Sequence, residues 1–308
     1  MAASRTIGGE EDWLRAAKVA SSWRAGGGHQ HFRRHPRGLS STLGNGICIR
    51  PRSGEPTDQD VPVEVLLAGA EVKSVHSQPA LRATRLSAFE RLHAEGRQTV
   101  LTGTHQVERA PAIGGPRWAV GAVLRPDLPA AQAIEQVARA AAAVVGANHW
   151  LAGAARSSHL SLRRHLEQRR RPISAGDRLV ARYAAALRAA AKSAGPVRFA
   201  ITGLILTPVS VMACAVPADA AADDLAAVFD AALRAEGCYE AGFMPVLWYV
   251  NLVYFTGPVR AADELAAWAE ARQQMKVTDV RVTETQIARW QYTTTGMMPV
   301  VLASASLL

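Results

Sequence analysis

The sequence predicts an α+β fold of two lobes in which a β-α-β unit occurs twice. In each of two regions, a strand-like apolar run is broken by a proline and followed by apolar residues at helical spacing and then by a second strand. The order of these elements is the same in both regions. The spacing also agrees, because 33 residues separate Pro126 from His159 and 34 separate Pro217 from Asn251. These observations predict a duplicated domain with pseudo-twofold symmetry.

The two units account for many of the regular elements that we expect. The first unit has its elements at 118–124, 134–144 and the residues leading to His159, and the second has them at 209–216, 225–233 and 246–255. Between the units, Ser174 and Asp177 are placed like a capping pair for a helix over 174–194, which Gly195 ends. The remaining expected elements are a strand at 197–206, a helix at 261–273 and strands at 277–287 and 299–302.

The N-terminal third is less regular. Residues 1–60 are rich in Gly, Ser, Arg and Pro and lack periodicity, which predicts a disordered basic extension. Residues 61–116 contain a short apolar run at 63–67 and a helical pattern near 86–92, but no pattern that indicates a function. We therefore expect the functional domain to occupy residues 117–308.

Composition restricts the function only weakly. The chain has 308 residues, a formal net charge of +9 and a pI near 10.1, which would suit binding to nucleic acid. Only four of its 35 Lys and Arg residues are lysine, however, so an Arg-rich composition bias explains the charge better. Three scattered cysteines and the absence of an apolar run of ~18 residues predict a cytoplasmic protein without disulfides or membrane spans.

One strand carries a polar motif that points to chemistry. In the segment around Ser158, alternation places His159 and Ser161 on one face and leucines on the other. In the second unit, Asn251 and Val253 alternate in the same phase. A pseudo-twofold fold would bring these two pairs together across a groove.

The repeated setting of this motif resembles the 2H phosphoesterases, which include 2′-5′ RNA ligase-like proteins and RNA cyclic phosphodiesterases. The resemblance covers residues 117–308 and rests on the motif His159-Leu160-Ser161, the strand 250–253, the proline spacing and the segment 199–217. It implies two lobes with antiparallel sheets around a central cleft, to which each lobe presents a His-x-Thr/Ser motif.

The resemblance also implies roles for the motif residues. One histidine would act as general base and the other as general acid, while hydroxyls hold the phosphate. His159 would thus be an acid/base catalyst and Ser161 a phosphate donor. Asn251 and Val253 depart from the pattern, since neither an amide nor an isopropyl group exchanges a proton near neutral pH. All nine histidines precede residue 166, so a second one would have to be His149, His165 or part of the N-terminal extension.

Further side chains are candidates for binding substrate. Arg163 continues the His159 face by alternation, and Tyr249 lies on the Asn251 face, where its ring could stack on a base. We also expect Asn251 and Val253 to line the cleft. The alternatives to a functional role are purely structural. His159 would be a half-buried histidine hydrogen-bonded to the backbone, and the arginines would belong to a solvated loop. No metal-binding, phosphate-loop or nucleophile-elbow motif is present, and nothing in the sequence indicates a metal or an organic cofactor.

Three functions follow from this interpretation. The first is a phosphodiesterase or hydrolase of the 2H type with one acid/base histidine, acting on a nucleotide, an RNA end or another phosphodiester. The second is an inactive or repurposed relative that binds a nucleotide or metabolite in the same cleft. The third, weaker one is metabolite chemistry for which a single acid/base suffices. The sequence does not indicate an oligomeric state.

Overall fold

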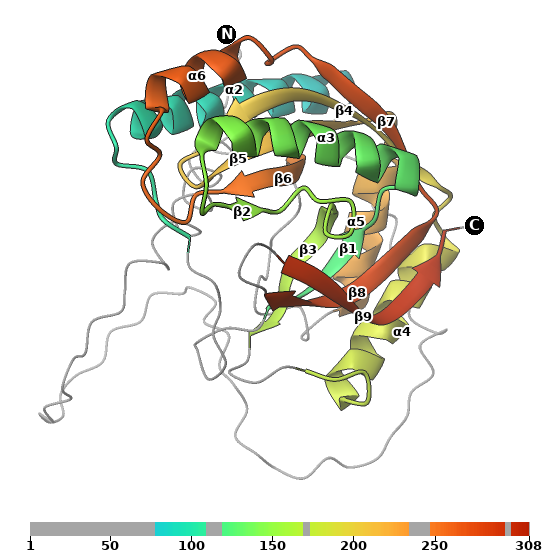
Figure 1. The fold of residues 1–308 in the computed structure, drawn as a ribbon. Coiled ribbons are helices and arrows are strands. Elements are labelled where there is room, and N and C mark those ends of the chain that lie inside the picture. The colour runs from blue at the N-terminus through green and yellow to red at the C-terminus, as the bar shows by residue number, and fades with distance from the viewer. Residues whose placement is uncertain (1–77, 109–118, 169–172, 234–246, 293–296, 308) are drawn as a thin grey trace, which may run out of the picture. The chain divides into compact units, whose positions relative to one another are not determined.

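The fold is an α+β arrangement of two antiparallel sheets with helices packed on them (Figure 1). The structure is a computed structural model, and it describes residues 78–108, 119–168, 173–233, 247–292 and 297–307. All of these belong to one compact unit. The extension expected at residues 1–60 and the apolar run at 63–67 lie outside the described residues.

The described elements follow the duplicated order that the sequence predicts. The helices are α2 (Gln78–Leu101), α3 (Leu128–Val145), α4 (Arg178–Lys192), α5 (Ala221–Leu233) and α6 (Ala262–Glu270). The strands are β1 (Ala119–Leu124), β2 (Trp150–Leu151), β3 (Leu160–Gln168), β4 (Val197–Leu206), β5 (Ser210–Pro217), β6 (Trp248–Tyr254), β7 (Lys276–Val282), β8 (Glu284–Tyr292) and β9 (Met297–Ser306). The units β1-α3-β3-α4-β4 and β5-α5-β6-α6-β7 therefore repeat one another.

The sheets reflect the same duplication. Sheet A has the order β3-β1-β8-β9, and sheet B has the order β2-β6-β5-β4-β7, with all neighbouring strands antiparallel. In both sheets the last strand of a β-α-β unit pairs with its first strand: β3 with β1, and β6 with β5. The strand expected at 277–287 is in fact two strands, since β7 pairs in sheet B and β8 pairs in sheet A, with Thr283 between them.

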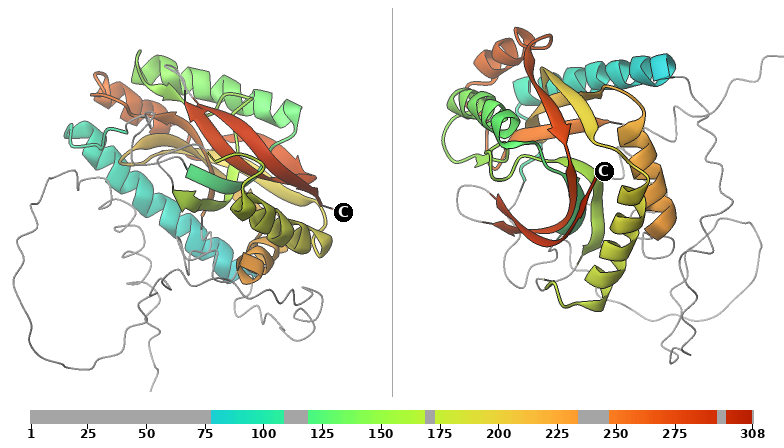
Figure 2. Two further views of the ribbon diagram at one scale, coloured as in Figure 1. Left: turned by 90° about the horizontal axis from the view of Figure 1, so that it is seen from below. Right: turned by 90° about the vertical axis from the view of Figure 1, so that its right-hand side faces the viewer.

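Each unit places its first helix against the other unit. Helix α3, from the first unit, packs on β6, β7 and α6 of the second. Helix α5, from the second unit, packs on α4 and β4 of the first, and α4 covers β8 and β9 of sheet A. Figure 2 shows α4 and α5 side by side along sheet A, and α3 and α2 on opposite sides of sheet B.

The core is mostly aliphatic, with a few aromatic side chains such as Trp248 and Phe229 buried in it. Alternate residues of both sheets face the crossing helices, among them Leu124 and Leu160 in sheet A and Val250 and Leu252 in sheet B, all of which are buried. Burial of such side chains stabilises the fold by ~1.5–3 kcal/mol each. The N-cap of α4 is Asp177, whose carboxylate accepts from the backbone N–H of Leu179, so the helix begins at Arg178 and not at the predicted Ser174.

Helix α2 has no counterpart in the repeat. It is longer than the pattern near 86–92 suggested, and it packs closely against the end of β4. A Cβ built at Gly96 would overlap the carbonyl of Leu206 and lie 2.5 Å from the Cα of Thr207. The backbone N–H of Leu206 donates to Nδ1 of His93 at 3.1 Å, and Arg85 pairs with Asp223 at 2.5 Å. The approach of helix to strand therefore requires a residue without a side chain at position 96.

No helix among the described residues is long and apolar enough to cross a membrane.

Candidate functional site

His159 stands directly before strand β3, where a tight turn delivers it to the sheet. Residues 155–157 form the turn, and the hydroxyls of Ser157 and Ser158 donate to the carbonyls of Ala152 and Gly153 at 2.8 and 3.0 Å. Both serines are buried, so these hydrogen bonds fix the backbone on either side of the turn. The position of His159 is thus set by the two residues that precede it.

The imidazole of His159 is held in one tautomer. Its Nδ1 lies 2.8 Å from the carbonyl oxygen of Ser157, and a carbonyl can only accept, so Nδ1 carries the proton and Nε2 keeps its lone pair. Burial is the main cause that lowers the pKa of His159 to about 4, with the positive charge of Arg125 acting in the same direction and the Ser157 hydrogen bond opposing them. The ring is therefore neutral at pH 7, with an unprotonated Nε2.

Trp290 covers the His159 ring. The two ring centroids are 4.3 Å apart and the planes are tilted by 33°. Trp290 packs with Val123 and Ala288 on the face of sheet A opposite the helices, and Ser161 is paired with Val123 across β1 and β3. His159, Ser161 and Trp290 thus share one face, which we call the His159 face. Trp290 could not be identified from the sequence, because nothing in the chain's periodicity links β8 to the turn before β3.

Arg125 is a second functional candidate, and its sequence position alone does not indicate it. Leu124 pairs with Leu160 at the end of the β1–β3 ladder, so the next residues, Arg125 and His159, stand opposite each other. The guanidinium Nη2 donates to the carbonyl oxygens of Ala155 and Arg156 at 3.3 and 2.8 Å. Arg125 therefore holds the same turn that delivers His159. The antiparallel register would have indicated it, had the pairing been known.

The second lobe departs from the predicted alternation at Val253. The pairing of β5 with β6 shifts between Val211–Val253 and Met212–Asn251, which marks a bulge. As a result, Leu252 and Val253 are both buried in the main core. The prediction that Val253 shares the face of Asn251 is therefore wrong, because one strand irregularity reverses the side on which it lies.

The residues of β6 that face away from the main core are Tyr249 and Asn251. Val250, between them, and Leu252, after them, both belong to the core. In the first unit Leu160 and Leu162 hold the same places relative to His159 and Ser161. Tyr249 and Asn251 therefore share one face of β6, as His159 and Ser161 share one face in the first unit.

Asn251 is engaged in hydrogen bonds with its own sheet. Its Oδ1 accepts from the hydroxyl of Ser210 at 3.1 Å, and its Nδ2 donates to the hydroxyl of Tyr254 at 2.7 Å. Ser210 is buried and bonded to Thr207 in the turn between β4 and β5. One acceptor and one donor of the Asn251 amide thus serve the sheet.

Tyr249 lies beneath helix α2. It packs with a buried cluster on this face of sheet B formed by Phe89 of α2 with Ile205, Met212 and Cys214. Burial raises the pKa of the Cys214 thiol, so the thiol stays protonated. The apolar part of this face is occupied by α2, while no helix of the described residues covers the His159 face in the same way.

Arg163 does not lie on the His159 face. The β1–β3 pairing shifts so that Ser161 opposes Val123 but Arg163 opposes Ala122, a core residue. Its side chain is 2% exposed and pairs with Asp230 of α5 at 2.5 Å. The alternation that assigned Arg163 to the His159 face is therefore wrong at this bulge, and the structure gives Arg163 a partner on the helix side.

The two candidate strands meet between the sheets. Strand β3 contacts β6, and the N–H of Gly153 donates to the carbonyl of Leu252 at 2.9 Å. A Cβ at Gly153 would lie 3.1 Å from the Cα of Leu252 and 2.7 Å from the Cβ of Ala138. Among the described residues no hydrogen bond joins His159 to Asn251.

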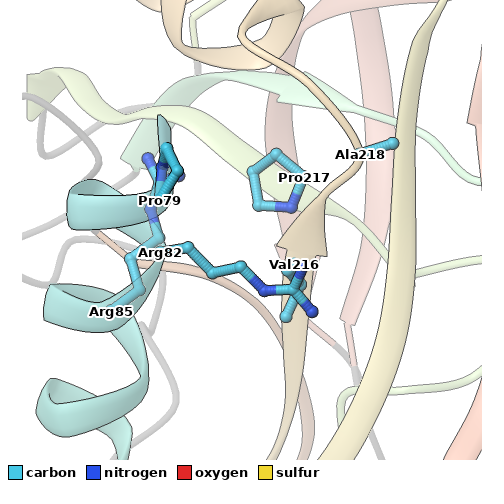
Figure 3. Close-up of a pocket in the computed structure, with 6 residues that line it drawn as sticks. All are labelled: Pro79, Arg82, Arg85, Val216, Pro217 and Ala218. Atoms are coloured by element: carbon cyan, nitrogen blue, oxygen red, sulfur yellow. The ribbon is translucent and has the colours of Figure 1, made fainter. Parts of the chain in front are cut away.

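A separate pocket of about 240 Å³ lies between the first turns of α2 and the end of β5 (Figure 3). Arg82 and Arg85 of α2 and residues 216–218 line it. Arg85 is already neutralised by Asp223, which also accepts from the indole N–H of Trp248 at 2.9 Å. In the part of the chain that the structure describes, no group of three or more His, Cys, Asp or Glu residues could hold a metal ion.

No protein-family model matches the chain, and no curated protein matches it either. Several solved structures are similar. TT0787 of Thermus thermophilus is 16% identical, with 61% of this chain and 97% of that chain covered and a TM-score of 0.46. For E. coli LigT with 3′-AMP the values are 14%, 62%, 98% and 0.41, and for a structure described as a phosphoesterase they are 15%, 62%, 98% and 0.40. At these identities and TM-scores the likeness assigns this chain neither a family nor a function. The duplicated α+β fold seen here is the one that the resemblance to the 2H phosphoesterases implied.

Proposed function

We propose that the protein acts on a phosphodiester, a nucleotide or an RNA end at the His159 face, with His159 as its acid/base group. The observation that carries the proposal is the hydrogen bond from Nδ1 of His159 to the Ser157 carbonyl. It leaves Nε2 as a proton acceptor at neutral pH, which a general base requires.

The reaction that suits this arrangement is attack on phosphorus by a hydroxyl or water. Nε2 of His159 would take the proton of the attacking oxygen, and the hydroxyl of Ser161 would donate a hydrogen bond to a phosphate oxygen. Tyr249 and Asn251 supply no imidazole for the leaving oxygen, so its proton would come from His159 in turn or from water. We therefore expect slow turnover rather than none.

The test is hydrolysis of 2′,3′-cyclic nucleotides and of 2′-5′-linked oligonucleotides. We expect His159→Asn to lower kcat by ~100- to 10,000-fold, since Asn can keep the Ser157 hydrogen bond but cannot accept a proton. Ser161→Ala should lower it less, and Ser193→Ala, which removes an exposed serine hydroxyl at the end of α4, should leave it unchanged. Equal turnover by the wild type and His159→Asn would refute a role for His159 in the chemistry.

The alternative is a binding protein without catalysis. It is favoured by one observation: the second lobe presents Tyr249 and Asn251, the first packed under α2 and the second bonded within its sheet. E. coli LigT has been solved with phosphate, 3′-AMP, NADP⁺ and ATP, which supplies a set of probes. Saturable binding of one of these together with no turnover of any substrate would select this alternative.

A further inference from the structure

We infer that Arg125 is the residue that binds the phosphate group of the ligand at the His159 face. This rests on the proposed function, in that it assumes a phosphorylated ligand, and it adds a residue that lies outside both motifs. The inference depends on the position of Arg125, on its hydrogen-bond partners and on the absence of a described counter-charge.

Arg125 lies opposite His159. It follows Leu124, the last residue of β1, and Leu124 pairs with Leu160 of β3. In an antiparallel pair, opposed side chains project to the same side. Leu124 and Leu160 face the core, so Arg125 and His159 both leave the sheet on the His159 face.

The guanidinium of Arg125 uses only some of its hydrogen-bond donors within the described residues. Its Nη2 serves the carbonyls of Ala155 and Arg156, and its Nε is buried and has no hydrogen-bond partner among the described residues. Glu135 is a carboxylate that is hydrogen-bonded to this turn. Its Oε2 accepts from the N–H of Ala155, but its Oε1 already pairs with Arg139. None of the ion pairs between described residues includes Arg125.

The positive charge of Arg125 has no carboxylate paired with it among the described residues. A guanidinium that is half-buried beside a neutral imidazole carries a positive charge that carbonyl oxygens neutralise only in part. Phosphate is an anion that suits it, because Nη1, which makes no hydrogen bond among the described residues, can donate charge-assisted hydrogen bonds to phosphate oxygens. Binding there would hold the phosphate beside His159 and supply a positive charge that the second lobe lacks, since neither Tyr249 nor Asn251 is cationic.

The test measures binding of inorganic phosphate by calorimetry, independently of turnover. We expect Arg125→Gln to weaken binding by roughly 10- to 100-fold, the loss typical of a charge-assisted hydrogen bond, and Arg125→Lys to weaken it less. Arg188→Gln is the matched control: Arg188 is exposed on α4, which packs on the opposite face of sheet A. It should bind phosphate like the wild type.

A second measurement needs no variant of Arg125. Phosphate added to the wild type should raise the NMR titration midpoint of the His159 ring, assigned with His159→Asn, and should leave that of His149 unchanged. Binding by Arg125→Gln within twofold of the wild type, an unmoved His159 midpoint, or no binding by the wild type would each overturn the inference. Phosphate binding that depends on Arg125, without turnover of any substrate, would support the role of Arg125 and refute the enzymatic function. Turnover together with phosphate binding that does not depend on Arg125 would support the enzymatic function and refute the role of Arg125.

Discussion

The imidazole of His159 lies against the indole of Trp290, with centroids 4.3 Å apart, although 131 residues separate the two in the chain. Trp290 is 6% exposed and belongs to β8, so the sheet rather than the turn provides the cover for the histidine. The environment that keeps His159 neutral is therefore formed by two segments that lie far apart in the chain.

Replacing Trp290 should restore the ordinary titration of His159. In Trp290→Leu, water reaches the ring, so we expect the pKa of His159 to rise from about 4 toward 6.5. Trp290→Phe keeps an aromatic cover and should change the pKa less. NMR titration of the imidazole measures both. An unchanged pKa in Trp290→Leu would show that other groups desolvate the histidine.

Acid should destabilise the protein through the same histidine. The unfolded chain binds a proton at His159 near pH 6.5 and the folded chain only near pH 4, so the unfolded state holds more protons between these values. Stability is therefore lost as the pH falls from 6.5 to 4, by at most about 2 kcal/mol between pH 7.5 and 5. Burial lowers the pKa of His93 and of His149 too, which adds to the effect.

The share of His159 is measured by urea unfolding at pH 7.5 and at pH 5. The stability difference between these two pH values should be smaller in His159→Asn than in the wild type, because one proton uptake site is gone. If both proteins lose the same free energy, the pKa of His159 is not lowered in the folded state.

Gly96→Ala should destabilise the protein even though alanine is the better helix former. The added methyl would overlap the backbone of Leu206 and Thr207, and neither can move without disturbing the end of β4. We expect a net loss of roughly 1–3 kcal/mol, against a propensity gain of ~1 kcal/mol. Thermal and urea unfolding measure it. Glu95→Ala, at an exposed position of the same helix, is the control and should change stability little.

Arg163→Met should affect stability and leave ligand binding intact. It leaves Asp230 without this partner, but Asp230 is 35% exposed and can be hydrated. The loss should therefore fall below the ~3–5 kcal/mol of a fully buried pair, on the order of 2 kcal/mol. Adding Asp230→Leu should recover part of it. If a folded Arg163→Met protein binds phosphate more than threefold more weakly than the wild type, Arg163 contributes to binding after all.

The duplicated architecture could be predicted from the sequence, since periodicity and proline spacing are local signals. The bounds of β4 were predicted without error, and the helix over 174–194 differs from α4 by four residues at its start and two at its end. The His159 motif was also visible, because alternation over a few residues is enough to place His159 and Ser161 on one face.

The errors arose where a strand is irregular. Bulges before Arg163 and Val253 change the side on which each lies, and a bulge leaves no mark in a pattern of alternating residues. Trp290 and Arg125 were missed for a different reason. Their relation to His159 depends on which strands pair and in which register, and that information is contained in contacts between segments far apart in the chain.

Helices α3 and α5 each leave their own unit to pack on the other. A half of this chain expressed alone would expose the apolar surface that its partner's helix covers, and its own first helix would have nothing to pack on. Cutting the chain between Leu206 and Ser210 should thus give two fragments that fold only when mixed, because each half needs the other to bury its apolar surface.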